Sequence, residues 1–460
     1  MTLDPILLSR IQWAWVIGWH ILLPAFTVGL ASYIAVLEGL FFTTGDAAWY
    51  RISRFWTQIF SVSFGMGVVS GIIMPFQFGT NWSRFSDATA NILSPMLAYE
   101  DLMAFFLEAT FLGVLLFGRH LVPRWAHLLA ACMVALGTLM SSFWILSVNS
   151  WMQTPAGFTF HDGRFFPTDW GAIVFNPSFP YRLAHNVVAF YVTTGFVVLG
   201  VGAWLLRRPR FAADGRRILR MAVGFLALFV PLQIALGDMH GLNTAQYQPA
   251  KLAAIEGRWE SAAPAPLTLW GWPDQQAERT DHALDIPVLG SLILTHSLHG
   301  EVRGLKTFPA DQRPPVWPVF WSFRVMVGIG LLMLAVVATA LALRLRGRLY
   351  DSDWFLRLCI WSAPSGFIAV LAGWTTTEVG RQPWTVYGLL RTAHSVSPSL
   401  KGSDVLLSFL AYAVVYLMMF PAGLLVMARI VRGGPTETPP GAPVAAMQAA
   451  APIHALSEKA

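Results

Sequence analysis

The chain has 460 residues, of which 55% are hydrophobic and only 12% are charged. A soluble globular protein has about 25% charged residues, so this composition excludes an ordinary soluble protein and indicates an integral membrane protein. The net charge of +6 could suggest a nucleic-acid partner, but the basic residues gather in short segments between apolar runs, which indicates membrane topology and no nucleic acid.

Apolar runs of roughly 20 residues or more, the length that crosses a bilayer, recur along the chain. Only helices and closed barrels satisfy their backbone in lipid, and alternating ten-residue strands are absent from the sequence, so we predict an all-α protein with transmembrane helices. The first run has no cleavage site and is expected to be retained. The nine expected spans are 14–42, 55–78, 94–118, 126–148, 184–206, 217–238, 319–344, 355–377 and 404–430.

Arginine placement predicts the orientation of these helices, because short cytoplasmic loops are rich in Lys and Arg. The segments that follow odd-numbered runs contain Arg51, Arg54, Arg119, Arg124, Arg207, Arg208, Arg210, Arg216, Arg217, Arg344, Arg346, Arg348, Arg357, Arg429 and Arg432. The remaining short loops are poorer in these residues. We therefore expect an N-terminus outside the cell and a cytoplasmic C-terminus.

Two segments differ from the nine-helix membrane domain expected over 1–432. Residues 239–318 form a polar outer loop that includes "KLAAIEGRWE" and "LWGWPDQQAE", and its Trp content indicates an ordered loop. Residues 433–460 are rich in Pro and Ala, which predicts a disordered cytoplasmic tail. Cys132 and Cys359 lie inside apolar runs without metal-site spacing, so we interpret both as inert core thiols.

Ionisable residues within spans are costly and therefore suggest function. Five candidate ligands from five runs share one depth near the outer side: His20, Glu100, His185, Met326 and Glu378. Histidine and methionine are common axial ligands of heme iron, whereas structural zinc sites favour clusters of Cys and His. The pattern favours a heme cluster in the outer leaflet.

Each candidate also has a structural interpretation. Either histidine could be an ordinary core or interface residue, Met326 could serve packing alone, and Glu378 could form a helix-terminal ion pair with Arg381. Glu100 and Glu108 are eight residues apart, or about 80° around an α-helix, so they could line one polar track or each pair with a base. Spacing alone leaves a heme site and a proton site as alternatives.

Five motifs in order give the chain a specific resemblance. They are "FQFGTNWS" (76–83), "LMAFFLEAT" (102–110), "NSWMQTP" (149–155), "KLAAIE" (251–256) and "GRQPW" (380–384). From about Ile6 to Arg432 the chain resembles subunit I of the cytochrome bd-type quinol oxidases. The resemblance implies nine transmembrane helices with the N-terminus outside, in agreement with the charge pattern.

By this resemblance, His185 and Met326 ligate a low-spin heme b that takes electrons from quinol. His20 and Glu378 serve the two high-spin hemes, one a heme b and the other a heme d or a further heme b. We favour His20 on the oxygen-reducing heme with Glu100 beside it, although family members can exchange these two sites.

The resemblance also implies roles for residues around the hemes. Trp374 matches a tryptophan between hemes, and Arg324 and Arg381 match residues that offset propionate charge. Lys251 and Glu256 match the quinol-binding residues of the outer loop. In addition, Glu108 matches a step in proton delivery.

The implied activity is that of a terminal oxidase, which oxidises ubiquinol at the outer face and reduces O2 to water, generating a proton gradient without a pump. The implied setting is the bacterial inner membrane, with a homologous subunit II and, in some members, a small single-helix subunit. The short outer loop is similar to that of the cyanide-insensitive branch, and "GDMHG" (237–241) departs from the acidic version of long-loop members.

Two other functions remain as alternatives. A proton-coupled transporter would use Glu100, Glu108 and Glu378 as a relay, but it predicts inverted repeats and broken helices, which the sequence does not show by eye. A heme-bearing anchor that only passes electrons from quinol would explain His185 and Met326 and leave the other ligands without a role.

Overall fold

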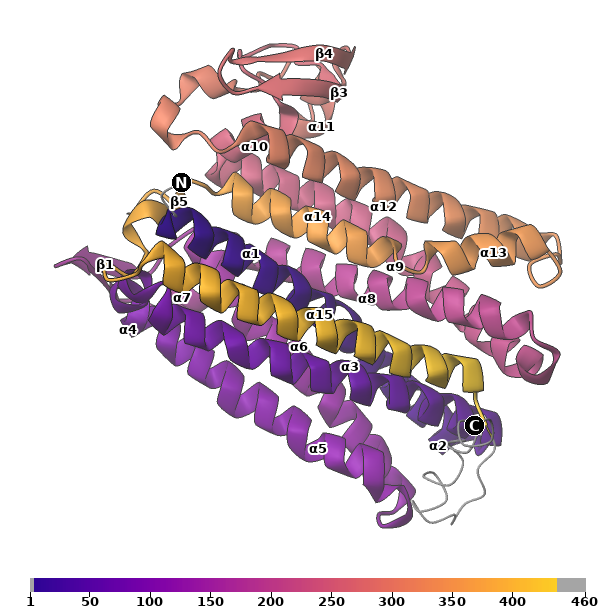
Figure 1. Ribbon diagram of the computed structural model, residues 1–460. Coiled ribbons are helices and arrows are strands. Elements are labelled where there is room, and N and C mark those ends of the chain that lie inside the picture. The colour runs from indigo at the N-terminus through magenta and orange to yellow at the C-terminus, as the bar shows by residue number, and fades with distance from the viewer. Residues whose placement is uncertain (1–3, 437–460) are drawn as a thin grey trace, which may run out of the picture.

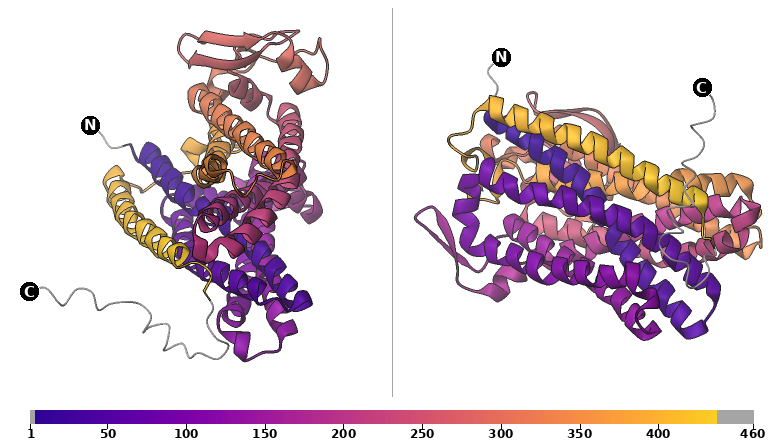
Figure 2. Two further views of the ribbon diagram at one scale, coloured as in Figure 1. Left: turned by 90° about the vertical axis from the view of Figure 1, so that its right-hand side faces the viewer. Right: turned by 60° about the horizontal axis from the view of Figure 1, so that its bottom comes forward.

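The computed structural model describes residues 4–436. Within this range, nine helical segments are long and apolar enough to cross a membrane, which confirms the predicted all-α membrane fold. They run side by side along one direction (Figures 1 and 2). The long helices are α1 (Pro5–Leu22), α2 (Pro24–Thr44), α3 (Ala47–Thr80), α4 (Ser83–Tyr99), α5 (Phe106–Phe117), α6 (Arg124–Gln153), α8 (Phe179–Leu206), α9 (Ala212–Tyr247), α12 (Val316–Leu345), α13 (Asp353–Ser362), α14 (Ser365–Gly380) and α15 (Gly402–Gly433).

The two ends of the bundle differ in their connections. One end, which we call the hairpin end, carries the N-terminal start of α1 and three antiparallel hairpins: β1 (Phe158–His161) with β2 (Arg164–Pro167), β3 (Leu267–Asp274) with β4 (Arg279–Ile286), and β5 (Trp384–Val386) with β6 (Leu390–Arg391). The other end, called the arginine end, carries the connections that contain the clustered arginines. All five candidate ligands lie nearer the hairpin end.

The first expected span lies within the candidate membrane segment Pro5–Thr44, but its helix is interrupted at Leu23. Proline has no backbone N–H, so Pro24 cannot donate to the carbonyl oxygen of His20 as an α-helix requires. The N–H of Leu23 donates to that oxygen instead, at 3.0 Å. His20 therefore lies in the last turn of α1, directly before the break.

Two further spans are interrupted. A π-helical segment, η1 (Glu100–Phe105), separates α4 from α5, and Ala363 and Pro364 separate α13 from α14. Single-turn π segments inside helices are uncommon and frequently occur at functional sites. Here the interruption begins at Glu100, one of the candidate ligands.

The expected outer loop is shorter than 239–318, since α9 continues to Tyr247 and α12 begins at Val316. Between them lie α10 (Pro249–Glu256), the β3–β4 hairpin and α11 (Leu289–Thr295). The predicted tail 433–460 lies outside the described residues apart from 433–436, and Gly433 is the last residue of α15. Cys359 is buried as expected, but Cys132 is exposed on the surface of α6, so its assignment to the core was wrong.

Helices that lie in lipid gain little from the hydrophobic effect and pack through small residues and interhelical hydrogen bonds. The contact of α2 with α8 contains both a small residue and an interhelical hydrogen bond. Gly29 approaches Thr194 so closely that an added Cβ would lie 2.4 Å from its hydroxyl oxygen. The Thr194 hydroxyl donates to the carbonyl oxygen of Phe26 at 2.8 Å. The adjacent core is apolar and includes the fully buried rings of Trp56 and Phe196.

A buried charged cluster joins four segments near the arginine end. Glu38 of α2 accepts hydrogen bonds from Ser53 of α3 and Arg119, and His127 of α6 lies 3.0 Å from its second carboxylate oxygen. The other ring nitrogen of His127 lies 3.1 Å from the carbonyl oxygen of Leu115. Glu38 and His127 are both buried.

Candidate functional site

Glu378 is the centre of the most connected polar cluster at the hairpin end. It lies in the last turn of α14, and Asn149 and Gln153 of α6 donate to its Oε1 atom at 3.0 and 3.3 Å. Arg381 donates to its Oε2 atom at 2.5 Å, so the ion pair suggested by the sequence is present. Three donors hold the carboxylate in one orientation.

A second ring of residues extends this cluster to α10 and α8. Arg182, one turn before His185 on α8, donates to the Oδ1 atom of Asn149. Lys251 of α10 donates to the Oε1 atom of Gln153 at 2.7 Å, and Gln248 donates to the same atom at 3.0 Å. The helix predicted to bind quinol is therefore hydrogen-bonded through a single glutamine to Glu378.

Lys251 points into the protein rather than out of the loop, and only 4% of its surface is exposed. Burial lowers the pKa of Lys251 well below its usual value, and the neighbouring charge of Arg182 lowers it further. The cluster also contains buried donors that lack a partner: Nε and Nη1 of Arg381 and Nε of Arg182. Such donors fit an anionic group placed beside Glu378, since an unpaired buried donor is costly.

Glu256 ends α10 and is also buried. Burial raises the pKa of its carboxyl group, and the charges of Arg324 and Arg258 partly oppose that shift. Its Oε2 atom has no hydrogen-bond partner. The carboxyl group therefore keeps one acceptor position free for a hydroxyl donor.

Arg324 of α12 holds α10 and β3 in place through hydrogen bonds. Its guanidinium donates to the carbonyl oxygen of Ile255 at 2.8 Å and also to that of Thr268 in β3. It lies over the ring of Phe320, 3.3 Å from the centroid. Its Nε atom remains without a partner. Arg324 thus joins α10 and β3 to α12 and retains one buried donor.

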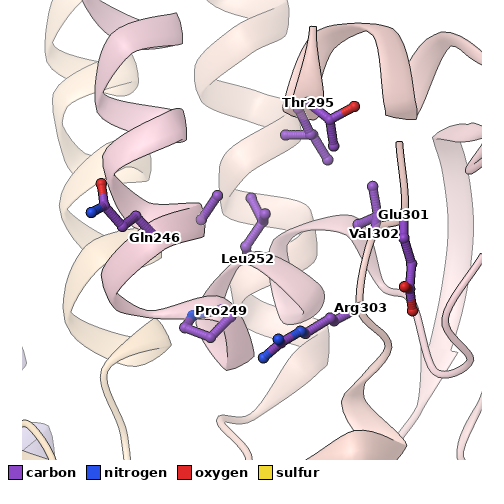
Figure 3. A pocket seen from close by; sticks show the side chains of 9 residues that line it. Gln246, Pro249, Leu252, Thr295, Glu301, Val302 and Arg303 are labelled. Carbon is purple, nitrogen blue, oxygen red and sulfur yellow. The ribbon is translucent and has the colours of Figure 1, made fainter. Parts of the chain in front are cut away.

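A cavity of about 280 Å³ lies beside α10, and Lys251 is not one of its lining residues. Its lining includes Gln246 at the end of α9, Pro249 and Leu252 of α10, and Glu301 and Arg303 of the following segment. Figure 3 shows Leu252 between Gln246 on one side and the segment with Glu301 and Arg303 on the other. The cavity combines apolar walls with two charged side chains, as small-molecule sites commonly do.

His20 is oriented by a hydrogen bond to α3. Its Nδ1 atom lies 2.9 Å from the hydroxyl oxygen of Ser70, whose proton is directed to the carbonyl oxygen of Gly67 at 3.0 Å. With that proton used, Ser70 accepts from Nδ1–H, which leaves Nε2 of His20 as the unprotonated nitrogen. This is the arrangement found in metal-ligating histidines, whose second nitrogen donates to a neighbouring group.

His185 lies in α8, close to Gln233 and His240 of α9. The side-chain amide nitrogen of Gln233 is 3.2 Å from Nδ1 of His185, and the His240 ring lies 5.5 Å away, centroid to centroid. The Oε1 atom of Gln233 is buried without a partner. Exchanging the two amide atoms, which is a matter of assignment, would let Oε1 accept from Nδ1–H and leave Nε2 of His185 free.

Met326 of α12 and Trp374 of α14 lie in the same part of the bundle as the predicted ligand His20. Met326 of α12 packs against Gly373 of α14, where an added Cβ would lie 2.7 Å from the thioether sulfur. Trp374, the next residue of α14, packs on the buried cluster that contains Ile21, the neighbour of His20. The structure therefore brings α1, α12 and α14 together around the predicted ligands.

Glu100 and Glu108 lie along one face of α6. Ser141 donates to Glu100 at 2.6 Å, and Glu108 packs against Gly137, where an added Cβ would lie 2.5 Å from its Cγ atom. Gly137 and Ser141 are one helical turn apart and share a face. Because a π-helix turns less per residue than an α-helix, η1 narrows the angle between the two glutamates, which favours the single polar track.

Sequence reasoning missed several residues that complete the cluster: Asn149, Gln153, Arg182, Gln248 and His240. Asn149 and Gln153 belong to a motif that was recognised but given no role. Their spacing of one helical turn at the end of an apolar run was the available signal, since it places two amides on one face. Arg182 precedes His185 by three residues, which is the same kind of signal.

Comparisons with known proteins identify the family of this chain. The family model "Cytochrome bd terminal oxidase subunit I" matches residues 8–435. The chain is 35% identical to the cytochrome bd-II ubiquinol oxidase subunit 1 of Escherichia coli, over 94% of this chain and 97% of that protein. It is 36% identical to the cytochrome bd ubiquinol oxidase subunit 1 of Bacillus subtilis, over 91% of each.

A solved structure gives the same result for the fold. The bd oxidase from Geobacillus thermodenitrificans superimposes with a TM-score of 0.88 at 31% identity, over 94% of this chain and 99% of that chain. The match of sequence and fold over nearly the whole length confirms the resemblance drawn from the five motifs. The chain belongs to the cytochrome bd terminal oxidase subunit I family.

Proposed function

We propose that this chain is the heme-bearing, quinol-oxidising subunit of a terminal oxidase that reduces O2 to water. Family membership makes it a quinol:oxygen oxidoreductase subunit. The observation that carries the assignment of residues is the cluster around Glu378, because it connects a buried carboxylate to the helix that holds Lys251 and Glu256. Buried charges held in this way are typical of functional sites in membranes.

The residues at the hairpin end fit hemes. His185 and Met326 would hold the low-spin heme b, while His20 and Glu378 would hold the two high-spin hemes, of which one is a heme d or a further heme b. The unpartnered donors of Arg381 and Arg324 would meet the propionates, and Trp374 would lie between hemes. When bound, the hemes supply the sites for electron transfer and for oxygen reduction.

Quinol would be oxidised beside α10. The free acceptor atom of Glu256 would take a hydroxyl proton, and burial, which raises the pKa of this carboxyl group, would help it to hold that proton. Lys251 would act from the inner side of the same helix, where its ammonium group contacts Gln153. The natural substrate would be ubiquinol, as in the names of two relatives.

Protons for water would come from the arginine end. Glu108 and Glu100 lie in that order along α6 towards the hairpin end, and Ser141 bonds the second of them. The clustered arginines favour a cytoplasmic arginine end and an external hairpin end. Quinol protons would then leave outside while protons for water enter from the cytoplasm, so that charge separates without a pump.

The chain would act in the bacterial inner membrane with subunit II of the oxidase, and a small single-helix subunit, which some family members have, would be a further candidate partner. The short loop between α9 and α12 supports a place in the cyanide-insensitive branch. The domain division would be a membrane domain over 1–432, which includes the quinol loop, followed by the tail from 433. Each of these points extends the family assignment.

A reduced-minus-oxidised optical spectrum of the purified complex tests the proposal. We expect one low-spin and two high-spin heme signals. A spectrum without heme would refute both the oxidase and the heme-bearing anchor, and a single low-spin heme would favour the anchor. A parallel measurement of quinol-driven O2 consumption separates the oxidase from a transporter, which would consume none.

A further inference from the structure

The β3–β4 hairpin exposes large apolar side chains that the proposed chemistry does not use. Trp270 is 56% exposed, Trp272 is 54% exposed and Leu284 is 60% exposed, and Leu269 and Ile286 are exposed as well. A hairpin surrounded by water usually has one polar face. Such a group of exposed apolar residues marks a surface that contacts protein or membrane.

The hairpin lies alongside the first turns of α12, in a fixed register. Gln275, in the turn of the hairpin, caps the N–H of Val316 at 3.0 Å. Further along, Trp272 packs on Trp317 at 5.8 Å between ring centroids, and Trp270 packs on Trp321 at 4.5 Å. Strand β3 thus descends along α12, with its turn at the end of the bundle.

The depth of this descent follows from the helix geometry. At the strand's deep end Arg324 donates to the carbonyl oxygen of Thr268, and Arg324 is eight residues beyond Val316. A rise of 1.5 Å per residue makes that about 12 Å along α12. Figures 1 and 2 show the hairpin beside α12 at the edge of the bundle, outside the spanning helices.

Along α12, from the end of the bundle inwards, the side chains change from charged to aromatic to aliphatic. The turn is charged, with Asp274 accepting from two backbone N–H groups and Glu278 paired with Arg313 at 2.7 Å. The exposed tryptophans follow, and below them α12 continues with exposed Val325 and Leu332 on the helix face that carries Trp317 and Trp321. The hairpin surface therefore continues into the apolar surface of a membrane-spanning helix.

We propose that the β3–β4 hairpin lies in the lipid headgroup layer at the hairpin end, where Trp270, Trp272 and Leu284 contact lipid. Tryptophan is enriched at this depth, because its ring is apolar while its N–H requires a polar partner. The hydrocarbon core is excluded, since a two-stranded sheet has open backbone edges. His282 and Asp285 of β4 are also exposed, and these polar side chains limit the depth to the headgroups.

The occupant is the bilayer rather than another protein chain. The gradient from charged turn to tryptophans to aliphatic helix surface matches the polarity gradient of a leaflet. A protein partner does not require such an order by depth. The inference depends on the membrane-spanning character of α12 and not on any heme or on quinol.

Nitroxide accessibility tests the inference in the intact oxidase, reconstituted in bilayer nanodiscs. Cys359 is fully buried, so a Cys132→Ser background leaves the added cysteine as the reactive one among the described residues. Labels are placed at Leu284→Cys, at Gln276→Cys in the turn, and at Asp162→Cys in the exposed β1–β2 turn as the aqueous control. Collision with O2 and with a water-soluble nickel chelate is measured at each site.

We expect the ratio of O2 to nickel accessibility at 284 to exceed that at 276 and 162 several-fold. Equal ratios at 284 and 162 would place the hairpin in water and overturn the proposal. A label at 284 that is shielded from both reagents would show a protein cover, which also overturns it. If Leu284→Cys fails to assemble, Ile286→Cys gives the same readout.

A second measurement tests whether the tryptophans hold the hairpin in place. The double variant Trp270→Ser and Trp272→Ser should increase amide hydrogen exchange over 267–286 in nanodiscs. Trp354→Ser, at an exposed tryptophan of the arginine end, is the matched control and should leave that exchange unchanged. Unchanged exchange in the double variant would refute the anchoring role.

Discussion

Gly373→Ala probes the proposed role of Met326 without altering Met326 itself. The new Cβ would lie 2.7 Å from the thioether sulfur, whereas ordinary contacts are about 3.5–4 Å, so the sulfur must move by about 1 Å. A methionine that only fills space can move that far at little cost. Alanine is also favoured over glycine inside a helix by about 1 kcal/mol.

The two interpretations of Met326 therefore predict opposite results. If it serves packing alone, Gly373→Ala should be neutral or slightly stabilising. If it ligates iron, a displacement of about 1 Å exceeds the tolerance of about 0.2 Å for a metal–ligand distance, and the ligand is lost. We expect the low-spin heme to become high-spin while His185 retains it.

The assay is the optical spectrum of the purified complex, together with its thermal midpoint and its quinol oxidase rate. We expect the rate to fall about tenfold or more, equivalent to about 1.4 kcal/mol in the barrier. Gly328→Ala on α12 is the control, because nothing lies within 4 Å of its added Cβ. A normal low-spin spectrum and a normal rate in Gly373→Ala would refute Met326 as a ligand.

Three further variants test separate parts of the proposal. His185→Ala should remove the low-spin signal together with quinol oxidation, and retention of a normal low-spin spectrum would exclude His185 as a ligand. Glu256→Gln should slow quinol turnover with all hemes bound. Burial raises the pKa of Glu256, so the contribution of this group to folding stability is present at low pH and lost as pH rises through the pKa of the folded state. The melting temperature of Glu256→Gln should therefore fall less than that of the unchanged protein over this pH range. Glu108→Leu should slow oxygen reduction and charge separation in time-resolved voltage measurements while electron transfer from quinol stays fast; normal charge movement with intact hemes would remove Glu108 from the path.

Much of the helical framework could be predicted because spanning a bilayer requires long apolar runs. The positions of the breaks were harder to predict. Pro24 follows the apolar pattern closely enough to be read as part of one helix, and its effect on the His20 carbonyl appears only in the hydrogen-bond pattern. The π segment at Glu100 has no signal in hydrophobic periodicity, because apart from the acidic pair Glu100 and Asp101 the surrounding positions are mostly apolar.

The candidate site was predictable where a costly residue stands in an apolar run, as for Glu108 and Glu378. It was less predictable where the residue lies in a polar segment. Lys251 was expected on the loop, outside the core, yet α10 folds back so that its ammonium group reaches Gln153. Such a contact depends on the return path of the chain and not on local pattern, so sequence spacing could not show it.

The cluster around Glu38 has a consequence for biosynthesis. Its members come from the first span, the second span, the loop after the third and the start of the fourth, so Glu38 lacks Arg119 and His127 until that much chain has been made. A lone carboxylate in a membrane is costly, and the ribosome delivers these partners in sequence. The first two spans should therefore stay loosely held at the translocon until the fourth arrives. Ribosome-bound chains from which only the first three spans have emerged should be more protease-sensitive than chains from which the fourth has emerged as well, and Glu38→Leu should abolish the difference.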